Sequence, residues 1–172
     1  MMLIGVFFGT NTGNTETVVE ILEKELKGNG FEVDVHDMSS ASVDDMAKYD
    51  QFIIAVPTWN DGELQDDFDA VFGEYESFDF SGKKVGFVGL GDQDGYPDNF
   101  LDAIGILGKP VLKNGGSIIG YWPTDGYEFT TSAGLAENGK FFGLGIDQDN
   151  QEDQTEDRIK SWVAQIKGEL GA

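Results

Sequence analysis

The turn from Gly9 to Thr15, with the sequence GTNTGNT, is the segment of this chain best suited to bind a ligand. It follows the apolar run Leu3 to Phe8 and precedes a helical pattern. At such a strand-to-helix turn, backbone N–H groups and Thr hydroxyls gather at the helix N-terminus, where the helix dipole favours an anion. The turn contains no Lys or Arg, so neutral donors would hold the anion, which suits a small phosphomonoester.

A triphosphate-binding loop would require a Lys directly after the second Gly of the turn. Asn14 stands there, which disfavours nucleotide hydrolysis. Taken alone, the turn is equally consistent with an ordinary capped junction, because Thr and Asn are common N-cap residues.

Two further loops follow strand-like runs and carry one large aromatic each. Residues 57–63 read PTWNDGE and contain Trp59, and residues 89–99 read GLGDQDGYPDN and contain Tyr96. In an open parallel sheet, ligands lie beyond the carboxyl ends of the strands. Each aromatic alone could be a partly buried packing residue, but an aromatic among Gly, Asn and Asp is poorly explained by core packing. Together with the phosphate turn, two such loops describe a site for flavin mononucleotide (FMN).

The residues usually used for catalysis are scarce in this chain. It has no Cys, which excludes disulfides, thiolate nucleophiles and iron–sulfur ligation, so redox chemistry would need a bound cofactor. Its single His, His36, argues against zinc sites and is expected to be solvated near a strand end.

The 172 residues include 32 acidic and 11 basic side chains, for a net charge of −21. No Lys or Arg lies between Lys48 and Lys83 or between Lys84 and Lys109. A strongly negative face repels nucleic acid and anionic membranes and attracts basic partner proteins, although a generic acidic surface also serves solubility. No run of 18 apolar residues and no signal-peptide pattern is present, so we expect one cytoplasmic domain spanning residues 1–172.

Strand-like and helix-like patterns alternate along the chain, which predicts an α/β fold with a parallel sheet between two helical layers. Pro57 is expected to end the third strand, Gly108–Pro110 to interrupt the fourth helix, and Thr155 to cap the last. The fifth strand is expected to be interrupted after Trp122 and to resume at Phe141. The predicted strands are 3–8, 31–36, 51–56, 85–90 and 117–122, and the predicted helices are 15–26, 42–46, 64–75, 98–113 and 155–170.

The acidic run Asp147 to Asp157 begins like a calcium-binding loop. Glu152 stands where such a loop needs Gly, and Arg158 where it needs the bidentate Glu, so we interpret the run as a solvated loop.

Taken together, these motifs resemble flavodoxins of the long-chain type, most closely the cyanobacterial and algal members. The resemblance runs from Leu3 to the C-terminus. Its matching stretches are residues 9–15, 57–63, 89–99, 120–123 (GYWP), 124–129 (TDGYEF), 139–144 (GKFFGL) and 158–167 (RIKSWVAQIK).

The resemblance implies a three-layer, doubly wound, flavodoxin-like fold. Its five-stranded parallel sheet would have the order 2-1-3-4-5, with a long insertion, Thr124 to Lys140, in the fifth strand. It also implies a noncovalent FMN site whose phosphate is wrapped by Thr10, Asn11, Thr12, Gly13, Asn14 and Thr15.

The remaining site residues also follow from the resemblance. Trp59 would cover one flavin face and Tyr96 the outer face, with Asp92 at the pyrimidine edge. The Asn60–Asp61 peptide would turn toward flavin N5 upon reduction, and Gly62 would give the backbone the conformational freedom to turn. The other expected cofactor-binding residues are Thr58, Asn99 and Asp149 near the ribityl chain, together with Pro57, Leu90 and Gly91.

The implied function is that of a low-potential one-electron carrier, not an enzyme, that shuttles between semiquinone and hydroquinone. It would substitute for ferredoxin as a monomer without membrane insertion, accepting electrons from photosystem I or another low-potential donor. Delivery would be to a basic partner of the ferredoxin-NADP reductase type. Asp61, Asp94 and Leu90 depart from the residues that many relatives carry, which leaves the redox potentials open.

Two other functions use a similar fold. An FMN-dependent quinone or nitro reductase would need substrate space over the flavin, where Tyr96 is expected. A receiver domain would need an acidic pair after the first strand and an Asp after the third, and the chain has neither.

Overall fold

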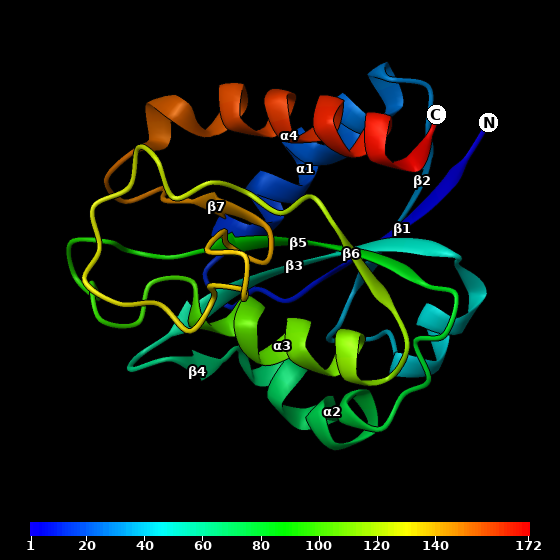
Figure 1. Ribbon diagram of the computed structural model, residues 1–172, viewed down its shortest axis with the longest axis horizontal. Helices are drawn as coiled ribbons and strands as arrows, with labels where there is room; N and C mark the ends of the chain where they lie inside the picture. Colours follow the sequence, from blue (N-terminus) through cyan, green and yellow to red (C-terminus); the bar gives the residue numbers. More distant parts are fainter.

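The computed structural model describes all 172 residues and has a twisted parallel sheet at its centre (Figure 1). The main strands run in the order β2-β1-β3-β5-β6, and β7 also pairs with β5. The strands are β1 (Leu3–Phe8), β2 (Glu32–Asp37), β3 (Gln51–Trp59), β4 (Glu63–Leu64), β5 (Lys84–Leu90), β6 (Ser117–Ile119) and β7 (Leu144–Ile146). The predicted α/β class and parallel sheet are confirmed.

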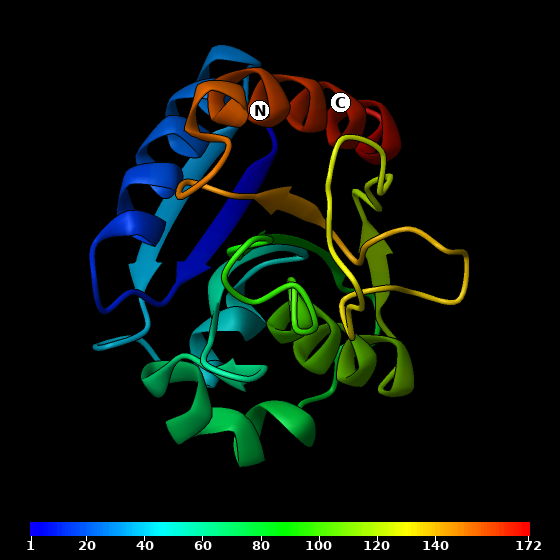
Figure 2. The ribbon, with the colours of Figure 1, turned by 90° about the vertical axis from the view of Figure 1, so that its left-hand side faces the viewer.

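Helices cover both faces of the sheet (Figure 2). The α-helices are α1 (Asn14–Gly28), α2 (Asp66–Glu76), α3 (Asp102–Lys113) and α4 (Thr155–Leu170), and the short 3-10 helices are η1 (Val43–Lys48) and η2 (Glu152–Gln154). Alternate strand residues point to opposite faces, and two apolar cores result. One packs under α1 and α4, and the other under α2, α3 and η1.

The predicted interruption of the fifth strand is present. Strand β6 pairs with the first half of β5 and β7 with its second half. The inserted segment closes at its neck, where Trp122 and Phe141 exchange backbone hydrogen bonds of 3.2 and 2.8 Å. The insertion therefore leaves β5 with a paired neighbour along both halves of its length.

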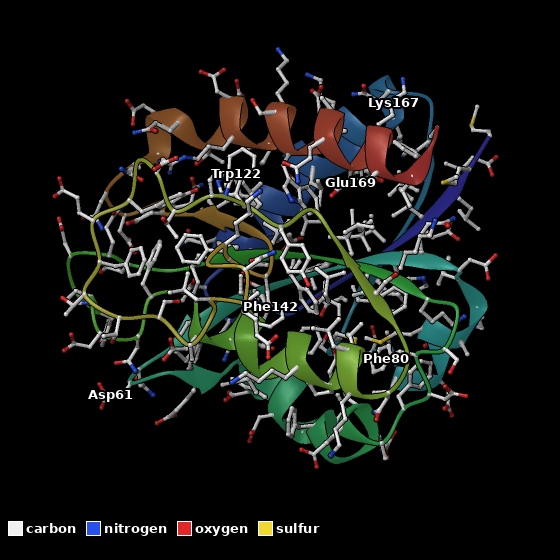
Figure 3. The ribbon with its side chains drawn as sticks, in the orientation of Figure 1. Asp61, Phe80, Trp122, Phe142, Lys167 and Glu169 are labelled. Atoms are coloured by element: carbon white, nitrogen blue, oxygen red, sulfur yellow. The ribbon has the colours of Figure 1, made fainter.

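Two expectations about proline are wrong. Strand β3 continues through Pro57 to Trp59. Its pairing with β1 ends at Ala55, so beyond that residue one side of the strand has no ladder for Pro57 to interrupt. Helix α3 likewise runs through Pro110 to Lys113, because its apolar side chains are buried. Gly108 serves close packing: a Cβ there would lie 2.6 Å from Cδ1 of Phe142, which lies over α3 in Figure 3.

Three side chains also differ from expectation. Thr155 is the first residue of α4, not its cap, and its hydroxyl bonds the side chain of Gln148. His36 is half-buried: its ring stacks on Phe7 at 4.7 Å, and its Nε2 lies 2.6 Å from the Tyr49 hydroxyl. Asp147, expected in a solvated loop, is fully buried. The partners of His36 and Asp147 come from segments distant in sequence, since Gln93 Nε2 donates to Asp147 Oδ2 at 2.7 Å. The partner of Thr155 lies only seven residues before it.

No helix in the structure combines the length and the apolar character needed to cross a bilayer.

A candidate cofactor site at the carboxyl edge of the sheet

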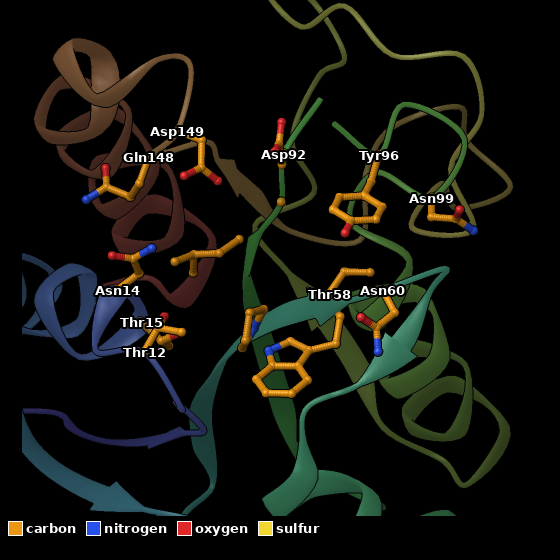
Figure 4. Close-up of a pocket in the computed structure, with 14 residues that line it drawn as sticks. Thr12, Asn14, Thr15, Thr58, Asn60, Asp92, Tyr96, Asn99, Gln148 and Asp149 are labelled. Atoms are coloured by element: carbon orange, nitrogen blue, oxygen red, sulfur yellow. The ribbon is translucent and has the colours of Figure 1, made fainter. Parts of the chain in front are cut away.

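A cavity of about 370 Å³ opens at the carboxyl ends of β1, β3, β5 and β7 (Figure 4). This volume lies within the range of small-molecule and cofactor sites. The lining residues are Thr12, Asn14, Thr15, Pro57, Thr58, Trp59, Asn60, Leu90, Gly91, Asp92, Tyr96, Asn99, Gln148 and Asp149. The three loops singled out in the sequence therefore converge on one site.

One end of the cavity is formed by Thr12, in the turn before α1, and by Asn14 and Thr15, the first residues of the helix (Figure 4). The helix has no side-chain cap, and its first backbone bond runs from Thr17 N to Gly13 O. The preceding N–H groups of the helix therefore have no helical acceptor. Free N–H groups and two hydroxyls without a neighbouring cation form a neutral cradle for an anion.

The turn that shapes this cradle is held from behind. Gly13 has a φ of 90°, which favours glycine, and its N–H donates to Thr10 Oγ1 at 2.9 Å. The Asn11 side chain is engaged by α2, accepting from Gln65 Nε2 at 2.6 Å and donating to Asp66 Oδ2 at 3.1 Å. Thr10, Asn11 and Gly13 do not line the cavity. The Thr10 hydroxyl and the Asn11 side chain instead hold the turn in place.

The other end of the cavity holds the two aromatic side chains. Trp59 ends β3 and is half-buried, whereas Tyr96 lies in the loop after β5 and is 46% exposed. The tyrosine loop is closed by Asp92, whose Oδ1 accepts from Gly95 N at 2.7 Å. That hydrogen bond lowers the pKa of Asp92, which remains a carboxylate. The aromatics are thus presented by two different loops.

Carboxylates border the cavity, and no Lys or Arg does. Oxygens of Asp92, Asp147 and Asp149 lie within 4.8 Å of one another. Asn150 Nδ2 lies among them and donates to Asp92 at 2.8 Å and to Asp147 at 2.9 Å. Burial, with the charges of Asp92 and Asp147, raises the pKa of Asp149. This edge of the site therefore opposes further negative charge.

The structure does not place every predicted site residue on the cavity wall. Asp61 and Gly62 do not line it, and Figure 3 shows Asp61 at the periphery of the molecule. Conversely, Gln148 lines the cavity and was not predicted. It follows β7, the resumed fifth strand, so the rule that ligands lie beyond strand ends could have identified it.

Comparisons with known proteins agree with this architecture. The family model described as flavodoxin matches residues 6–162. The chain belongs to the flavodoxin family. A flavodoxin of Nostoc sp. is 54% identical over 168 residues, covering 98% of this chain and 97% of the relative. Flavodoxin 1 of Escherichia coli is 43% identical over 171 residues, covering 99% and 96%.

A solved structure shares the fold closely. The crystal structure of Fusobacterium nucleatum flavodoxin bound to flavin mononucleotide has a TM-score of 0.92 and 34% identity, covering 98% of this chain and 99% of that one. The long-chain resemblance is confirmed, and cyanobacterial flavodoxins at 54% and 50% identity are among the relatives found. The observed strand order is the one expected for a flavodoxin.

Proposed function

We propose that residues 1–172 form one flavodoxin-like domain that binds FMN noncovalently and carries single electrons. The observation that supports this most strongly is the combination, in one cavity, of an uncharged anion cradle on α1 with two aromatic side chains on separate loops. A phosphomonoester fits the cradle, and a flat ring fits the aromatic end. Membership of the flavodoxin family supports the same ligand.

The donor set fits FMN at each part of the cavity. Thr12, Asn14 and Thr15 would hold the phosphate, and Thr58, Asn99 and Asp149, which also line the cavity, would contact the ribityl chain. Trp59 and Tyr96 would cover the ring. FMN, when bound, supplies one-electron redox chemistry that no side chain of this Cys-free chain provides.

The residues of the chain set the conditions for that chemistry. Tyr96 and Trp59 restrict access to the ring, which favours electron transfer over hydride transfer to a substrate. Asp92 and Asp149 line a site without cations, so added negative charge is disfavoured and the potential of the last reduction step is low.

The surface charge supports basic redox partners. Only two salt bridges are present, Lys27–Glu23 and Lys48–Asp45, so most of the 32 acidic side chains are not neutralised by ion pairing. We propose a basic acceptor of the ferredoxin-NADP reductase type, and photosystem I or another low-potential protein as donor. The same field disfavours nucleic acid.

Stepwise anaerobic reduction of the FMN-loaded protein, followed by its visible spectrum, tests this function. We expect stoichiometric FMN and two resolved one-electron steps, with negligible NAD(P)H-dependent turnover of quinones. Absence of FMN binding would refute the assignment. Rapid quinone turnover would instead favour a reductase.

A further inference from the structure

A buried carboxylate lies behind the wall of the cavity without lining it. Asp102, at the start of α3, is 6% exposed. Its Oδ1 accepts from Ala133 N at 2.6 Å, and its Oδ2 accepts from Asn99 Nδ2 at 2.9 Å. Asn99 Nδ2 also donates to the carbonyl oxygen of Asp61 at 3.2 Å. A continuous chain of hydrogen bonds therefore joins the insertion to the loop that carries Trp59.

That loop has a conformation that needs support. Asn60 has a φ of 45° and Gly62 a φ of 93°, and Gly62 N donates to Trp59 O at 3.1 Å to close the turn. The left-handed conformation costs free energy for a non-Gly residue such as Asn60, and it persists when the surroundings hold it. Trp59 and Asn60 form part of the cavity wall, so the turn determines where that wall stands.

The pair also fits tightly against the turn. A Cβ added to Gly62 would lie 2.6 Å from Asp102 Oδ2 and 3.0 Å from Asn99 Nδ2. The turn therefore rests directly on both side chains, of which Asn99 bonds Asp61, and a displacement of Asp102 reaches the turn by packing as well as through Asn99.

Asp102 is itself fixed by the insertion. Residues 130–133 run along residues 97–102, and the buried Leu101 in that segment has a φ of 60°. Besides the bond from Ala133, the hydrogen bonds run from Thr130 N and Thr131 N to Pro97 O, from Thr131 Oγ1 to Asp98 O and from Ser132 Oγ to Phe100 O. These bonds hold the segment that presents Asn99 and Asp102.

We propose that Asp102 is a positioning residue for the cofactor site: through Asn99 it fixes the Asp61 carbonyl and so holds the Trp59–Gly62 turn in its ligand-ready form. The link to cofactor affinity rests on the proposed function, whereas the link to the turn does not.

The variant Asp102→Asn separates this role from simple anchoring. Its Oδ1 still accepts from Ala133, but its amide group faces Asn99 Nδ2, donor against donor. If Asn99 rotates to present its oxygen, its amide group leaves Asp61. In the first case the bond between Asn99 and residue 102 is lost, and in the second the bond from Asn99 to Asp61, so the chain from residue 102 to the turn is broken either way. Asp98→Asn is the matched control, because it removes the same charge from an exposed side chain of the same segment.

The primary readout is amide hydrogen exchange of Gly62 in the apoprotein. Loss of a hydrogen bond to a charged group changes an equilibrium constant, here that for opening of the turn, by roughly tenfold or more. We expect Gly62 exchange to accelerate by about that factor in Asp102→Asn, with core amides of α4 unchanged and Asp98→Asn like the parent. Asn99→Ala should reproduce the effect, and the double variant should add nothing further. Unchanged Gly62 exchange, or uniform acceleration of all amides, would overturn the proposal.

The second readout is FMN affinity, measured by flavin fluorescence quenching. We expect the dissociation constant to rise about tenfold in Asp102→Asn and to stay unchanged in Asp98→Asn. If the parent protein binds no FMN, the proposed function fails while the exchange data still decide the role of Asp102 in the turn. If the parent binds FMN and Asp102→Asn binds it equally well, the link to cofactor affinity is refuted and the function stands.

Discussion

The Arg158 guanidinium lies 4.1 Å from the centre of the Tyr127 ring, which joins α4 to the insertion. Arg158 is only 8% exposed and also bonds Gly126 O and Gln151 Oε1. The Tyr127 hydroxyl donates to Gly145 O on β7 and accepts from Trp122 Nε1 at 3.0 Å. One tyrosine therefore connects the insertion, its neck and the resumed strand.

This arrangement predicts a loss of stability at alkaline pH. Burial raises the pKa of Tyr127 to about 12, whereas an unfolded Tyr ionises near pH 10. Because the folded pKa is the higher one, the contribution is complete below about pH 10 and is lost as the pH rises toward 12. In urea unfolding of the apoprotein, Tyr127→Phe should cost about 1 to 3 kcal/mol at pH 8 and show a smaller further loss at pH 11. A parallel pH dependence in both proteins would contradict this assignment.

Gly62→Ala should perturb the site more than the fold. The new Cβ would meet Asp102 and Asn99 at a φ of 93°, so the turn must shift. We expect FMN affinity to fall. We expect the potential of the first one-electron step, from oxidised flavin to semiquinone, to change more than that of the second step. Gly73→Ala is the control, because Gly73 lies in α2 with open space around the position of an added Cβ. This variant should increase the free energy of unfolding by about 0.5 to 1 kcal/mol and leave the site unchanged. Equal effects of both changes would argue against a special role of the turn.

The carboxylates near the cavity should lower the potential of the last reduction step. A charge about 10 Å away opposes an added electron by about 1 to 2 kcal/mol at an effective dielectric of about 20, which is some tens of millivolts at about 59 mV per tenfold. Asp149→Asn should therefore raise this potential most, because Asp149 lines the cavity. Asp61→Asn and Asp94→Asn should raise it less, since both side chains are exposed outside it. Spectroelectrochemical titration measures this potential in the three variants and so ranks their effects. If the potential rises in none of them, solvent screens these charges.

Electron exchange with a basic partner should slow as salt rises, because screening acts over about 10 Å at 0.1 M. Asp66 and Asp69 are exposed at the start of α2, beside the α1 turn, and carry part of this attraction. Asp102 lies in the same acidic stretch, but its burial removes it from the interacting surface. Stopped-flow rates should fall for Asp66→Lys and Asp69→Lys and stay unchanged for Asp44→Lys in η1. Rates independent of ionic strength would contradict steering by charge.

The sequence predicted the features that depend on local pattern. Leu3–Phe8 and the turn after it are readable because apolar burial and turn chemistry are short-range signals. The continuation of α3 through Pro110 depended on its buried face, and the stacking of His36 on Phe7 depended on strand pairing. Asp102 gave no local signal, because its partners Asn99 and Ala133 come together only when the insertion folds back.

The most direct test of the account is the affinity of the apoprotein for FMN compared with riboflavin, measured by titration calorimetry. The cradle formed by Thr12, Asn14 and Thr15 should bind FMN about one to one and far more tightly than riboflavin. Replacing Thr12 and Thr15 by Val should weaken FMN binding by about 1.5 to 3 kcal/mol for each hydrogen bond lost to the phosphate, and leave riboflavin binding unchanged. Equal affinity for the two flavins in the parent protein would contradict the central claim.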